Sequence, residues 1–588
     1  MAIEPPPDRS ILDRPWFAPM LLSLAWLATV MIVQPVGEFP TNDDFAYSLT
    51  MRALVRDGRF QLTDWQSVTL TSQALWAAPF CLIGGFSHLA LRISTLVAGL
   101  LGIHATHALL VHFRLGRRFS LFSSLVVALN PMYLALADTF MTDVPAYATI
   151  VGATYFIFTG LDDDRPGRYW FGLFLGLVSV FVRQTGLGVF FGLLAAYPLF
   201  RPSWRLWLTH ALLPTIAAWG LLAVYDLLLA FYDQVPYVYY ARHKMLAVPI
   251  NDLLHWKLGV VKVPLYRIPP TSVYLGIFFA PVFVLLVSAW GRATTSARRI
   301  ALGVAGATAA GLVALALESA GVRMPFFGNI IVDFGIGPQT LKGEAPKAPR
   351  WLWAASSAVG VWGAVAMYAL WARTALDAWI HRRDRDRPIR LPHFVFLLVL
   401  VAVLIGPLLV MYGGYYDRYI LSLYLVAILF AAASFAAASD PWRDAGRVAR
   451  GLAIAGLVLL GAWSIGVVHD YFAWNRARWT AARYATETLK VDPDRLDGGF
   501  EVNNFVHFEK NLYVKGDVEL VKLDPATEIL LGATHVLALG PVVGFRTLSE
   551  FPCRAWLPYS PQRILLLEAE PGEPAALAPQ ITPAPLGR

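Results

Sequence analysis

The sequence predicts an α-helical protein that crosses a membrane many times and carries a small C-terminal α/β or α+β domain. Hydrophobic residues make up 57% of the 588 residues, the mean hydropathy is +0.54, and charged residues contribute only 15%. A soluble protein carries about 25% charged residues. The apolar residues gather into long stretches between short polar loops, as in polytopic membrane proteins. The net charge of +8 is therefore interpreted loop by loop and is no sign of nucleic-acid binding.

The first apolar stretch covers residues 16–36 and follows a polar, proline-rich segment that we expect to be disordered. This stretch is too long for the core of a signal peptide, and no small-residue cleavage site follows it, so we interpret it as a retained anchor. Residues 71–86 are apolar but short, and Pro79 and Gly84-Gly85 interrupt them. We expect this segment to be re-entrant or interfacial.

About thirteen spans are predicted from length and hydropathy. They cover residues 16–36, 89–113, 121–136, 146–161, 169–182, 186–200, 207–230, 272–290, 300–320, 351–371, 393–412, 419–439 and 451–468. A cytoplasmic N-terminus places the short basic loops inside, as the positive-inside rule requires. These loops are residues 114–118, 162–168, 201–205, 292–299, 381–390 and 443–450. The loops around Asp43 and Asp138, both long loops and the C-terminal region then share the outer side.

The composition divides the chain into three parts. Residues 1–474 form the predicted membrane domain, residues 475–570 a soluble extracytoplasmic domain, and residues 571–588 a disordered tail rich in Pro and Ala. In the soluble domain we expect a helix at 476–490 and β-strands at 499–502, 518–523, 535–539 and 563–568. The two cysteines, Cys81 and Cys553, allow at most one disulfide, and nothing in the sequence pairs them.

Residues 37–47 directly follow the first span and carry two adjacent carboxylates, Asp43 and Asp44. Apolar residues then recur with helical spacing until Gly58, which predicts a short amphipathic helix along the membrane surface. In a purely structural interpretation, Thr41 or Asn42 caps this helix, and the carboxylates favour the positive end of its dipole. In a functional interpretation, the pair does chemistry at the membrane surface.

The predicted topology gathers further charged groups on the outer face. They are the carboxylates Asp138 and Asp143 and the guanidinium groups Arg183 and Arg418. Asp143 has a structural alternative as a helix cap before Pro145, and Asp138 as a polar edge residue. The arginines have an alternative as snorkelling side chains. Arginine is depleted on the outer side, however, so two arginines there favour a function.

Carboxylates, arginines and aromatic residues at an outer membrane surface suit one kind of reaction. A carboxylate can take the proton of an acceptor hydroxyl as it attacks a sugar carbon. An arginine can neutralise the leaving phosphate of a lipid held between spans. The alternative is a transporter or flippase for a lipid-linked or small anionic substrate. Transporters place charges near the bilayer midplane and often show inverted repeats, and neither is evident here. A third possibility is a non-catalytic scaffold whose outer domain binds cell-wall polymer. It would give the carboxylates at the membrane surface no function.

Other polar groups have simpler interpretations. His104 and His107 lie three residues apart on one helical face, but no third ligand is evident, which favours packing or interhelical hydrogen bonds over a metal site. We interpret Glu501, His507 and Glu509 as a solvated surface. We interpret the tyrosines of the first long loop as an interfacial aromatic belt. The alternative is that they contact a lipid donor or an acceptor. They are Tyr232, Tyr237, Tyr239 and Tyr240.

The order of several motifs resembles the GT-C superfamily of membrane glycosyltransferases. The chain is similar in particular to the protein O-mannosyltransferases and the bacterial aminoarabinose lipid A transferases. The motifs are Asp43-Asp44 followed by Tyr47, Gly84-Gly85-Phe86 followed by Arg92, Asn130-Pro131, Asp143-Val144-Pro145, Arg183-Gln184-Thr185-Gly186 and Asp417-Arg418-Tyr419. The likeness covers residues 16–200 and the region around Arg418, and the number of spans and the outer C-terminal domain agree with it.

The resemblance implies roles for these residues. Asp43 is the leading candidate for the catalytic base, and Asp44 stands where relatives more often carry Glu. Asp143 is the second acidic site, which orients the acceptor or a metal. The resemblance also implies that Arg418 lies near the donor phosphate. A divalent cation is left open, with Asp44 and Asp143 as its candidate ligands, and no other cofactor is expected.

One feature departs from the relatives. Several relatives carry Lys-Pro-Pro ahead of the interfacial segment, where this chain has Thr71-Ser72-Gln73, so a lysine that could touch the phosphate is missing. Arg183 or the Arg242-His243-Lys244 cluster is the candidate replacement. Tyr47 and Tyr416 are secondary candidates beside the main residues.

The implied activity is a hexosyl or pentosyl transfer, with inversion, from a polyprenyl-phosphate donor to an acceptor on the outer face of the cell inner membrane. The acceptor is a lipid, a protein or a polysaccharide. The C-terminal domain lacks a Trp-Trp-Asp-Tyr-Gly-like signature, which argues against an oligosaccharyltransferase.

Overall fold

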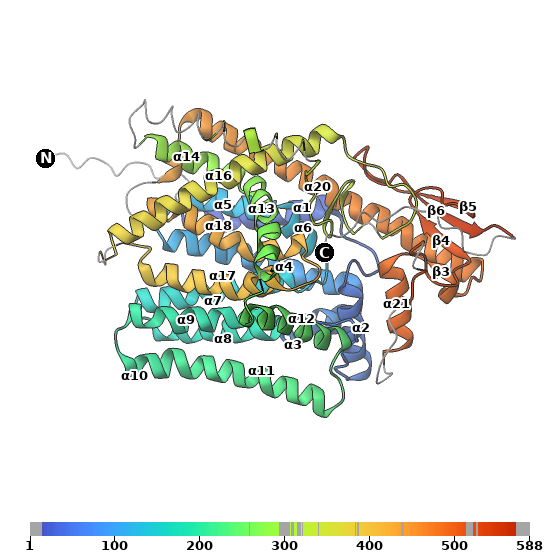
Figure 1. Cartoon of the computed structure of the whole chain (residues 1–588), viewed down its shortest axis with the longest axis horizontal. Coiled ribbons are helices and arrows are strands. Elements are labelled where there is room, and N and C mark those ends of the chain that lie inside the picture. Colours follow the sequence, from blue (N-terminus) through green and yellow to red (C-terminus); the bar gives the residue numbers. More distant parts are fainter. Residues whose placement is uncertain are drawn as a thin grey trace.

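The computed structural model describes residues 14–571 except 258, 293–305, 307, 309, 310, 314, 316–318, 320, 339, 383, 385, 386, 437–439, 513–520, 525 and 526. Within these residues the protein is a bundle of long helices with a small sheet at one end (Figure 1). The termini that we expect to be disordered lie almost wholly outside the described residues. The predicted fold class, an α-helical polytopic membrane protein with a small C-terminal sheet region, is confirmed.

The elements follow the chain in three groups. The first is α1 (Phe17–Val33), α2 (Asp44–Asp57), α3 (Thr71–Gly84), α4 (His88–His112), α5 (Arg117–Ala128), α6 (Pro131–Ala137), α7 (Asp143–Asp162), α8 (Pro166–Val182), η2 (Gln184–Gly186), α9 (Leu187–Phe200), α10 (Trp204–Trp207), η3 (Leu208–Leu212) and α11 (Leu213–Phe231). The second is α12 (Tyr237–Leu254), α13 (Gly259–Phe278), α14 (Ala280–Arg292), β1 (Ile331–Val332), β2 (Gly335–Ile336), α16 (Arg350–Ile380), α17 (Leu391–Val410), η4 (Asp417–Leu423), α18 (Tyr424–Ala432), η5 (Ala433–Phe435), α19 (Pro441–Asp444) and α20 (Arg447–Arg483). The third is η6 (Tyr484–Thr488), η7 (Pro493–Arg495), β3 (Leu496–Asp497), α21 (Phe500–Lys510), β4 (His535–Ala538), β5 (Phe545–Pro552) and β6 (Arg563–Ala569).

Each predicted span outside residues 293–320 coincides with a helix or with consecutive helices. In the described part of the chain, 7 helices are long and apolar enough to cross a membrane, or up to 9 if each bent pair is one span. The bends lie between α5 and α6 (61°) and between α13 and α14 (79°). Three further predicted spans, α1, α8 and η2–α9, are shorter apolar helices. The span predicted at 300–320 lies largely outside the described residues, so the number thirteen stays a prediction.

Close helix packing holds the bundle together, and the contact between α13 and α16 shows how. A Cβ on Gly276 would stand 1.9 Å from the Gly360 carbonyl oxygen, and a Cβ on Gly363 would stand 2.1 Å from the Gly276 oxygen. Only glycine permits this approach, because any larger side chain would push the two backbones apart. Small residues at such contacts are typical of helix packing in membranes.

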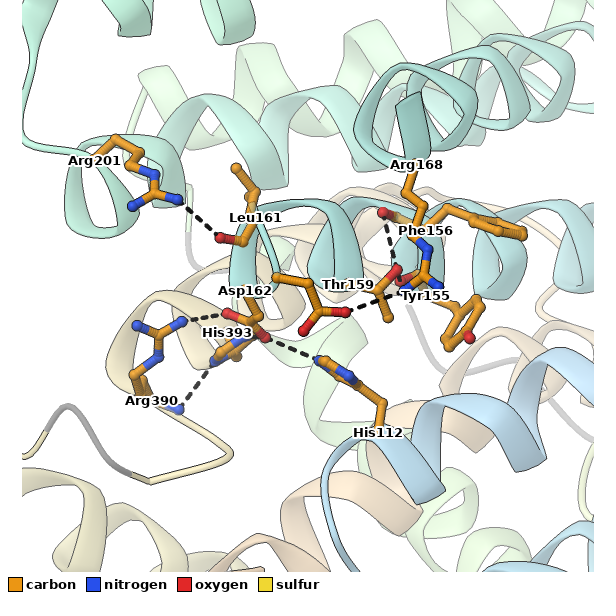
Figure 2. A network of polar contacts seen from close by, with 11 residues as sticks. His112, Tyr155, Phe156, Thr159, Leu161, Asp162, Arg168, Arg201, Arg390 and His393 are labelled. Carbon is orange, nitrogen blue, oxygen red and sulfur yellow. Dashed lines mark hydrogen bonds and ion pairs between the residues drawn. The ribbon is translucent and has the colours of Figure 1, made fainter. Parts of the chain in front are cut away.

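Several of the described loops that the charge pattern assigns to the inner side meet at one end of the bundle. There the Asp162 carboxylate lies 2.9 Å from His112 Nε2 and 3.1 Å from His393 Nε2, and it pairs with Arg390 (Figure 2). Arg201 pairs with Asp164 at the same end. We call the set of Asp162, His112, His393 and Arg390 the inner latch. It ties the ends of α4, α7 and α17 together.

The segments that the charge pattern assigns to the outer side gather at the opposite end. In Figure 1, α2, α21 and the C-terminal strands lie at this end, and α10 lies at the other. Asp417 accepts hydrogen bonds from the Ile330 and Ile331 amides and so ties η4 to the second long loop. Contacts among the described loops agree with the predicted grouping, and the two sides and their orientation in a membrane stay predictions.

The C-terminal region differs from the sequence prediction in two elements. The span predicted at 451–468 and the helix predicted from 476 are one continuous helix, α20, which crosses the proposed domain boundary at 474 without a break. The strand predicted at 499–502 is wrong, because these residues open the helix α21 after Gly499. A short alternating run is ambiguous between strand and helix, and here the apolar face of α21 packs on α2.

The strands that do form make a 4-stranded sheet in the order β3-β4-β6-β5. β4 and β6 match the strands predicted at 535–539 and 563–568, and they pair antiparallel. Residues 518–520 of the strand predicted at 518–523 lie outside the described residues, and Leu523 forms an isolated bridge with Leu530. Cys81 and Cys553 are both free and buried.

Candidate functional site

Two ion pairs stand at the outer end of the bundle. In the first pair, Nη1 of Arg418, a residue of η4, lies 2.7 Å from Oδ2 of Asp43, the residue immediately before α2. Arg183 Nη1, at the end of α8, donates to Asp143 Oδ1 of α7 over 2.5 Å. Both pairs join segments far apart in the sequence. Four residues predicted separately for the site are therefore brought into two partly buried carboxylate–guanidinium pairs.

The Asp43 carboxylate is also held from a second side. Trp65 Nε1 donates to Asp43 Oδ1 over 3.0 Å. Burial alone would raise the pKa of Asp43, but the charge of Arg418 and the Trp65 hydrogen bond hold this pKa below its ordinary value. Arg242 of α12 adds a weaker effect in the same direction. Asp43 is therefore ionised at neutral pH and able to accept a proton.

Asp44 is enclosed and differs from its neighbour in almost every respect. Its Oδ1 accepts the Thr41 amide over 2.5 Å, and its Oδ2 accepts the Thr41 hydroxyl over 3.1 Å and the Phe140 amide over 3.2 Å. Burial raises its pKa to about 7, against the opposing charge of Arg92 and these hydrogen bonds. Only 1% of Asp44 is exposed, so it fixes the loop and has no open path to a substrate.

The predicted capping of α2 is wrong in its details. Asp43 occupies the N-cap position without a side-chain capping bond, and neither Thr41 nor Asn42 caps the helix. Instead Asn42 adopts a left-handed φ of 56°, which asparagine tolerates better than most residues, and its side chain accepts the Asp43 amide. The chain thereby turns sharply enough to leave Asp43 facing Arg418. Gly58 ends the helix with φ 64°, as predicted.

Arg92 acts as a clamp on the same loop. Its guanidinium donates to the Pro35 carbonyl over 3.1 Å and to the Gly37 carbonyl over 2.7 Å, and it also contacts the Phe39 carbonyl. Asp138 lies fully buried within the electrostatic reach of Arg92, and neither of its oxygens has a hydrogen-bond partner in the described part of the chain. Burial raises the pKa of Asp138 well above its ordinary value, against the opposing charge of Arg92. Asp138 is thus part of the loop's support rather than of an open site.

A cavity opens beside the two ion pairs, and we call it the apolar pocket. Asp143, Arg183 and Arg418 line its polar end. Its walls continue along α7 through Tyr147, Ile150 and Val151 and along α17 through Leu400, Leu404 and Leu408. The α17 residues recur every four positions and so form one stripe, about 12 Å long at the helical rise of 1.5 Å. The empty space in the pocket is about 610 Å³ and includes open solvent.

Several buried polar atoms at this polar end have no hydrogen-bond partner among the described residues. They include Asp143 Oδ2, Arg418 Nε and the Tyr419 hydroxyl. Buried polar atoms are normally satisfied, so unpaired donors and acceptors at one place call for an explanation. A polar group of a bound ligand would supply the missing partners.

The secondary candidates have different surroundings. Tyr47 is buried within reach of the charges of Asp43, Arg418, Arg183 and Asp143. The Tyr416 ring lies 5.4 Å from the Arg418 guanidinium carbon. Arg242 acts on Asp43 only through its charge. Lys244 stands over the Tyr240 ring at 4.5 Å, and nothing in the structure connects it to the ion pairs. The His243 side chain lies outside the described residues.

The candidate cation ligands, Asp44 and Asp143, already have other partners. Asp44 is bound to Thr41 and Phe140, and Asp143 to Arg183. Within the described part of the chain, no cluster of three or more His, Cys, Asp or Glu side chains could hold a metal ion. His104 hydrogen-bonds Ser23 on α1 over 3.0 Å, as an interhelical contact.

Sequence reasoning misjudged two residues that shape the site. Glu501 is not on a solvated surface but is fully buried, and it accepts hydrogen bonds from Arg478 (2.7 Å), the Thr340 hydroxyl (3.1 Å) and the Asn42 amide (3.3 Å). Trp65 was not singled out, although it donates directly to Asp43. A tryptophan in a polar loop close to a carboxylate pair could have predicted such a contact. The residues around Glu501 in the sequence give no indication of its hydrogen-bond partners.

The comparisons with known proteins bear on part of this architecture. A family model described as dolichyl-phosphate-mannose-protein mannosyltransferase matches residues 73–228. This segment runs from α3 to α11 and contains Asp138, Asp143 and Arg183, but neither Asp43 nor Arg418. The predicted resemblance to the protein O-mannosyltransferases, and so to GT-C glycosyltransferases, is confirmed there. None of the curated protein sequences compared with the chain matches it.

Solved structures give weaker similarities along most of the chain. ArnT from Cupriavidus metallidurans bound to undecaprenyl phosphate is 14% identical, with 93% of this chain and 97% of that chain covered and a TM-score of 0.39. Its apo state is 15% identical, with 94% and 98% covered and a TM-score of 0.36. An Archaeoglobus fulgidus oligosaccharyltransferase tethered to an acceptor peptide is 13% identical, with 88% and 61% covered and a TM-score of 0.41. At these TM-scores, no property of this chain is inferred from the three structures.

Proposed function

We propose that the protein is a membrane glycosyltransferase that moves a sugar from a polyprenyl-phosphate carrier to an acceptor hydroxyl on the outer face of the membrane. One observation carries the proposal: the Asp43–Arg418 pair, 2.7 Å apart, stands beside a pocket with a polar end and apolar walls. A phosphate at the end of a long hydrocarbon chain has the same division into charged and apolar parts. The family-model match over residues 73–228 supports the same class of enzyme.

The donor phosphate would bind between Arg418 and Arg183. Both guanidinium groups reach the polar end of the apolar pocket, and a guanidinium can bind phosphate through two hydrogen bonds. The leucine stripe of α17 would hold the first part of the polyprenyl chain. Each arginine is paired with a carboxylate in the free protein, so an arriving phosphate competes for Arg418 and loosens its hold on Asp43. Donor binding would thereby make Asp43 a stronger base.

The reaction is a direct displacement at the sugar carbon. The acceptor oxygen forms the new bond to this carbon as the bond from the carbon to the phosphate oxygen breaks. The acceptor proton passes to Asp43, and the bonding pair leaves with the phosphate, whose charge Arg418 and Arg183 neutralise. Attack opposite to the leaving group inverts the configuration of the carbon. Asp143 keeps Arg183 in place through its 2.5 Å hydrogen bond and presents a free oxygen to the site.

For the transferred sugar, the acceptor, the membrane and a metal ion, we propose what the sequence predicts. The transferred group would be a hexose or a pentose, and the acceptor a lipid, a protein or a polysaccharide. The membrane would be the cell inner membrane, with the N-terminus in the cytoplasm and the C-terminal domain outside, since the basic loops lie at the end of the bundle away from Asp43. A divalent cation would have to bind at Asp143 with substrate atoms as further ligands.

The donor assignment is tested by the retention of lipid. The protein is purified in mild detergent, mixed with undecaprenyl phosphate and examined by native mass spectrometry. We expect wild type to retain the lipid and Arg418→Ala to lose it. The matched control is Arg546→Ala, which removes an arginine from an exposed pair with Glu568 on the sheet. Equal retention by all three folded proteins, or no retention by any, would overturn the donor assignment.

The competing function is a transporter or flippase of a lipid-linked or small anionic substrate. Its discriminating experiment uses proteoliposomes that contain the donor lipid on one side. A transporter moves the lipid between leaflets without an acceptor, whereas the proposed enzyme releases polyprenyl phosphate only when an acceptor is present. Movement between leaflets that persists in Asp43→Asn would favour the transporter.

A further inference from the structure

A second cavity lies at the outer end, apart from the apolar pocket, and we call it the outer cleft. Four segments form it: the loop before α3, the end of the second long loop, the region from β3 into α21, and the residues Val521, Leu523 and Glu528 between α21 and β4. The space inside is about 1230 Å³ and includes open solvent. This is about twice the space in the apolar pocket. The ion pairs and the lipid pocket of the proposed function do not account for it.

The outer cleft shares a wall with the candidate base. Trp65 lines the cleft, and its indole nitrogen donates to Asp43 over 3.0 Å. The Trp65 ring meets the Phe500 ring edge to face, with 5.5 Å between centroids, and Phe500 lines the cleft as well. A ligand that rests on these two rings therefore comes within one side chain of the carboxylate that would activate an acceptor.

The side chains that line the outer cleft indicate which kind of ligand it could bind. The charged side chains of opposite sign, Lys342 and Glu528, stand 3.5 Å apart and pair with each other. Asp497 is engaged by the Leu530 amide and by Asn503. Among the described residues that line it, the cleft therefore offers no unpaired charge cluster to an ionic ligand.

Two partly exposed aromatic rings suit a ligand with flat apolar faces. Of the two carboxamides of α21 in the lining, Asn503 is already bonded to Gly498 and Asp497, and Asn504 donates to the Phe500 carbonyl. Asn504 Oδ1 has no partner among the described residues and could accept from a ligand hydroxyl.

We propose that the outer cleft is the acceptor subsite and that it binds a carbohydrate, whose reacting hydroxyl it directs toward Asp43. Sugar rings carry C–H faces that pack on aromatic side chains and hydroxyl groups that bond to amides. The proposal rests on the proposed function, because an acceptor subsite has meaning only beside a donor. It narrows the acceptor from lipid, protein or polysaccharide to the carbohydrate part of a glycolipid, a glycoprotein or a polysaccharide.

Trp65 has a separate part in this proposal as a positioning residue. Its ring contacts the ligand, and its N–H orients Asp43. Trp65→Phe keeps a ring in the cleft but removes the hydrogen bond to Asp43. This variant should bind carbohydrate about as well as wild type and transfer sugar more slowly. Trp65→Ala should lose both properties.

The test measures carbohydrate binding and donor retention on the same purified full-length protein. The probes are a printed array of short neutral and acidic oligosaccharides and, in parallel, undecaprenyl phosphate followed by native mass spectrometry. We expect wild type to bind neutral oligosaccharides and Phe500→Ala to bind them up to about tenfold more weakly (about 1.4 kcal/mol), because the variant loses one of the two aromatic faces of the cleft. Trp556→Ala, an exposed aromatic residue outside the cleft, is the matched control and should bind as wild type does.

The outcomes separate the two proposals. Donor retention without carbohydrate binding by wild type overturns the acceptor subsite and leaves the donor site standing. Binding of the acidic oligosaccharides alone overturns the neutral-carbohydrate chemistry. Failure to retain the donor overturns the proposed function and the acceptor subsite with it. If Phe500→Ala does not fold, Trp65→Ala supplies the comparison, and binding unchanged in a folded Trp65→Ala also overturns the inference.

Discussion

Asp43 and Asp44 are adjacent in the chain, but their surroundings give the two carboxylates different properties. Asp43 is partly exposed and paired with Arg418, whereas Asp44 is enclosed by Thr41 and Phe140. The sequence offered both as catalytic candidates and could not separate them, since the distinction lies in the turn at Asn42. Asp43 is the more exposed of the two and is the one that we propose as the base.

Substitution of the two aspartates should therefore have different effects. We expect Asp43→Asn to lower the transfer rate of the folded enzyme by about 10²–10⁴-fold, the usual contribution of a general base. Its melting temperature should fall as well, because the buried Arg418 loses its counter-charge. Asp44→Asn should mainly lower the melting temperature, because the amide cannot accept all the hydrogen bonds of the loop. The measurement is a single-turnover transfer assay beside thermal melting. Full activity in Asp43→Asn would remove this residue from the mechanism.

The pH dependence of stability gives an independent check on Asp44. Its pKa is about 7 in the folded protein and about 4 when unfolded, so between these values the folded state holds a proton that the unfolded chain has released. The contribution of this group to stability is fully present below pH 4 and is lost as the pH rises through 7. Asp138, with its raised pKa, acts in the same direction.

Thermal melting from pH 4 to pH 8 in detergent, compared between wild type and Asp44→Asn, isolates this contribution. We expect the melting temperature of wild type to fall more steeply with rising pH than that of the variant, which has no proton to lose. Parallel curves would show that Asp44 does not titrate in this range.

At the scale of elements, the helices were predictable and their junctions were not. Hydropathy located α4, α7 and α17 because a span must bury about twenty apolar residues. The same reasoning divided α20 at residue 474, since a change in composition looks like a boundary even where the backbone stays helical. It also assigned residues 499–502 to a strand, although the contact with α2 favours a helix. Periodicity over four residues is too short to decide such cases.

The inner latch should support the bundle without affecting the site. Asp162 lies at the opposite end of α7 from Asp143, about 28 Å away along the helix. Asp162→Asn leaves Arg390 without its carboxylate, and we expect a clearly lower melting temperature, since breaking a buried pair costs about 3–5 kcal/mol when burial is complete and less when it is partial. Retention of undecaprenyl phosphate should be unchanged at temperatures where the variant is folded.

Asp163, the residue after Asp162, provides the control for the Asp162→Asn experiment. Asp163 pairs with Arg168 at an exposed position, so Asp163→Asn should cost less than about 1 kcal/mol and leave the melting temperature nearly unchanged. Equal melting temperatures for the two variants would mean that the latch contributes no more than a surface pair.

At the scale of the whole molecule, the C-terminal region is bound to the candidate site through buried polar contacts. Glu501 of α21 accepts from Arg478 of α20 and from the Asn42 amide, one residue before Asp43. Such contacts between residues hundreds of positions apart follow from the packed chain, and no local pattern encodes them. Charge placement did predict that these segments share one end of the molecule, because loop charges decide the side on which a segment lies.

Glu501→Gln should therefore disturb the acidic loop from a distance. The substitution leaves the fully buried Arg478 guanidinium without a counter-charge, and loss of one partner of a buried pair is strongly destabilising. We expect faster hydrogen exchange at residues 37–44 and a reduced transfer rate, because Asp43 loses its fixed position. Glu509→Gln is the control, since its pair with Arg52 is more exposed and lies on the same helix. If exchange in the loop stays as slow in Glu501→Gln as in Glu509→Gln, the C-terminal region does not position the base, and its role lies in the outer cleft alone.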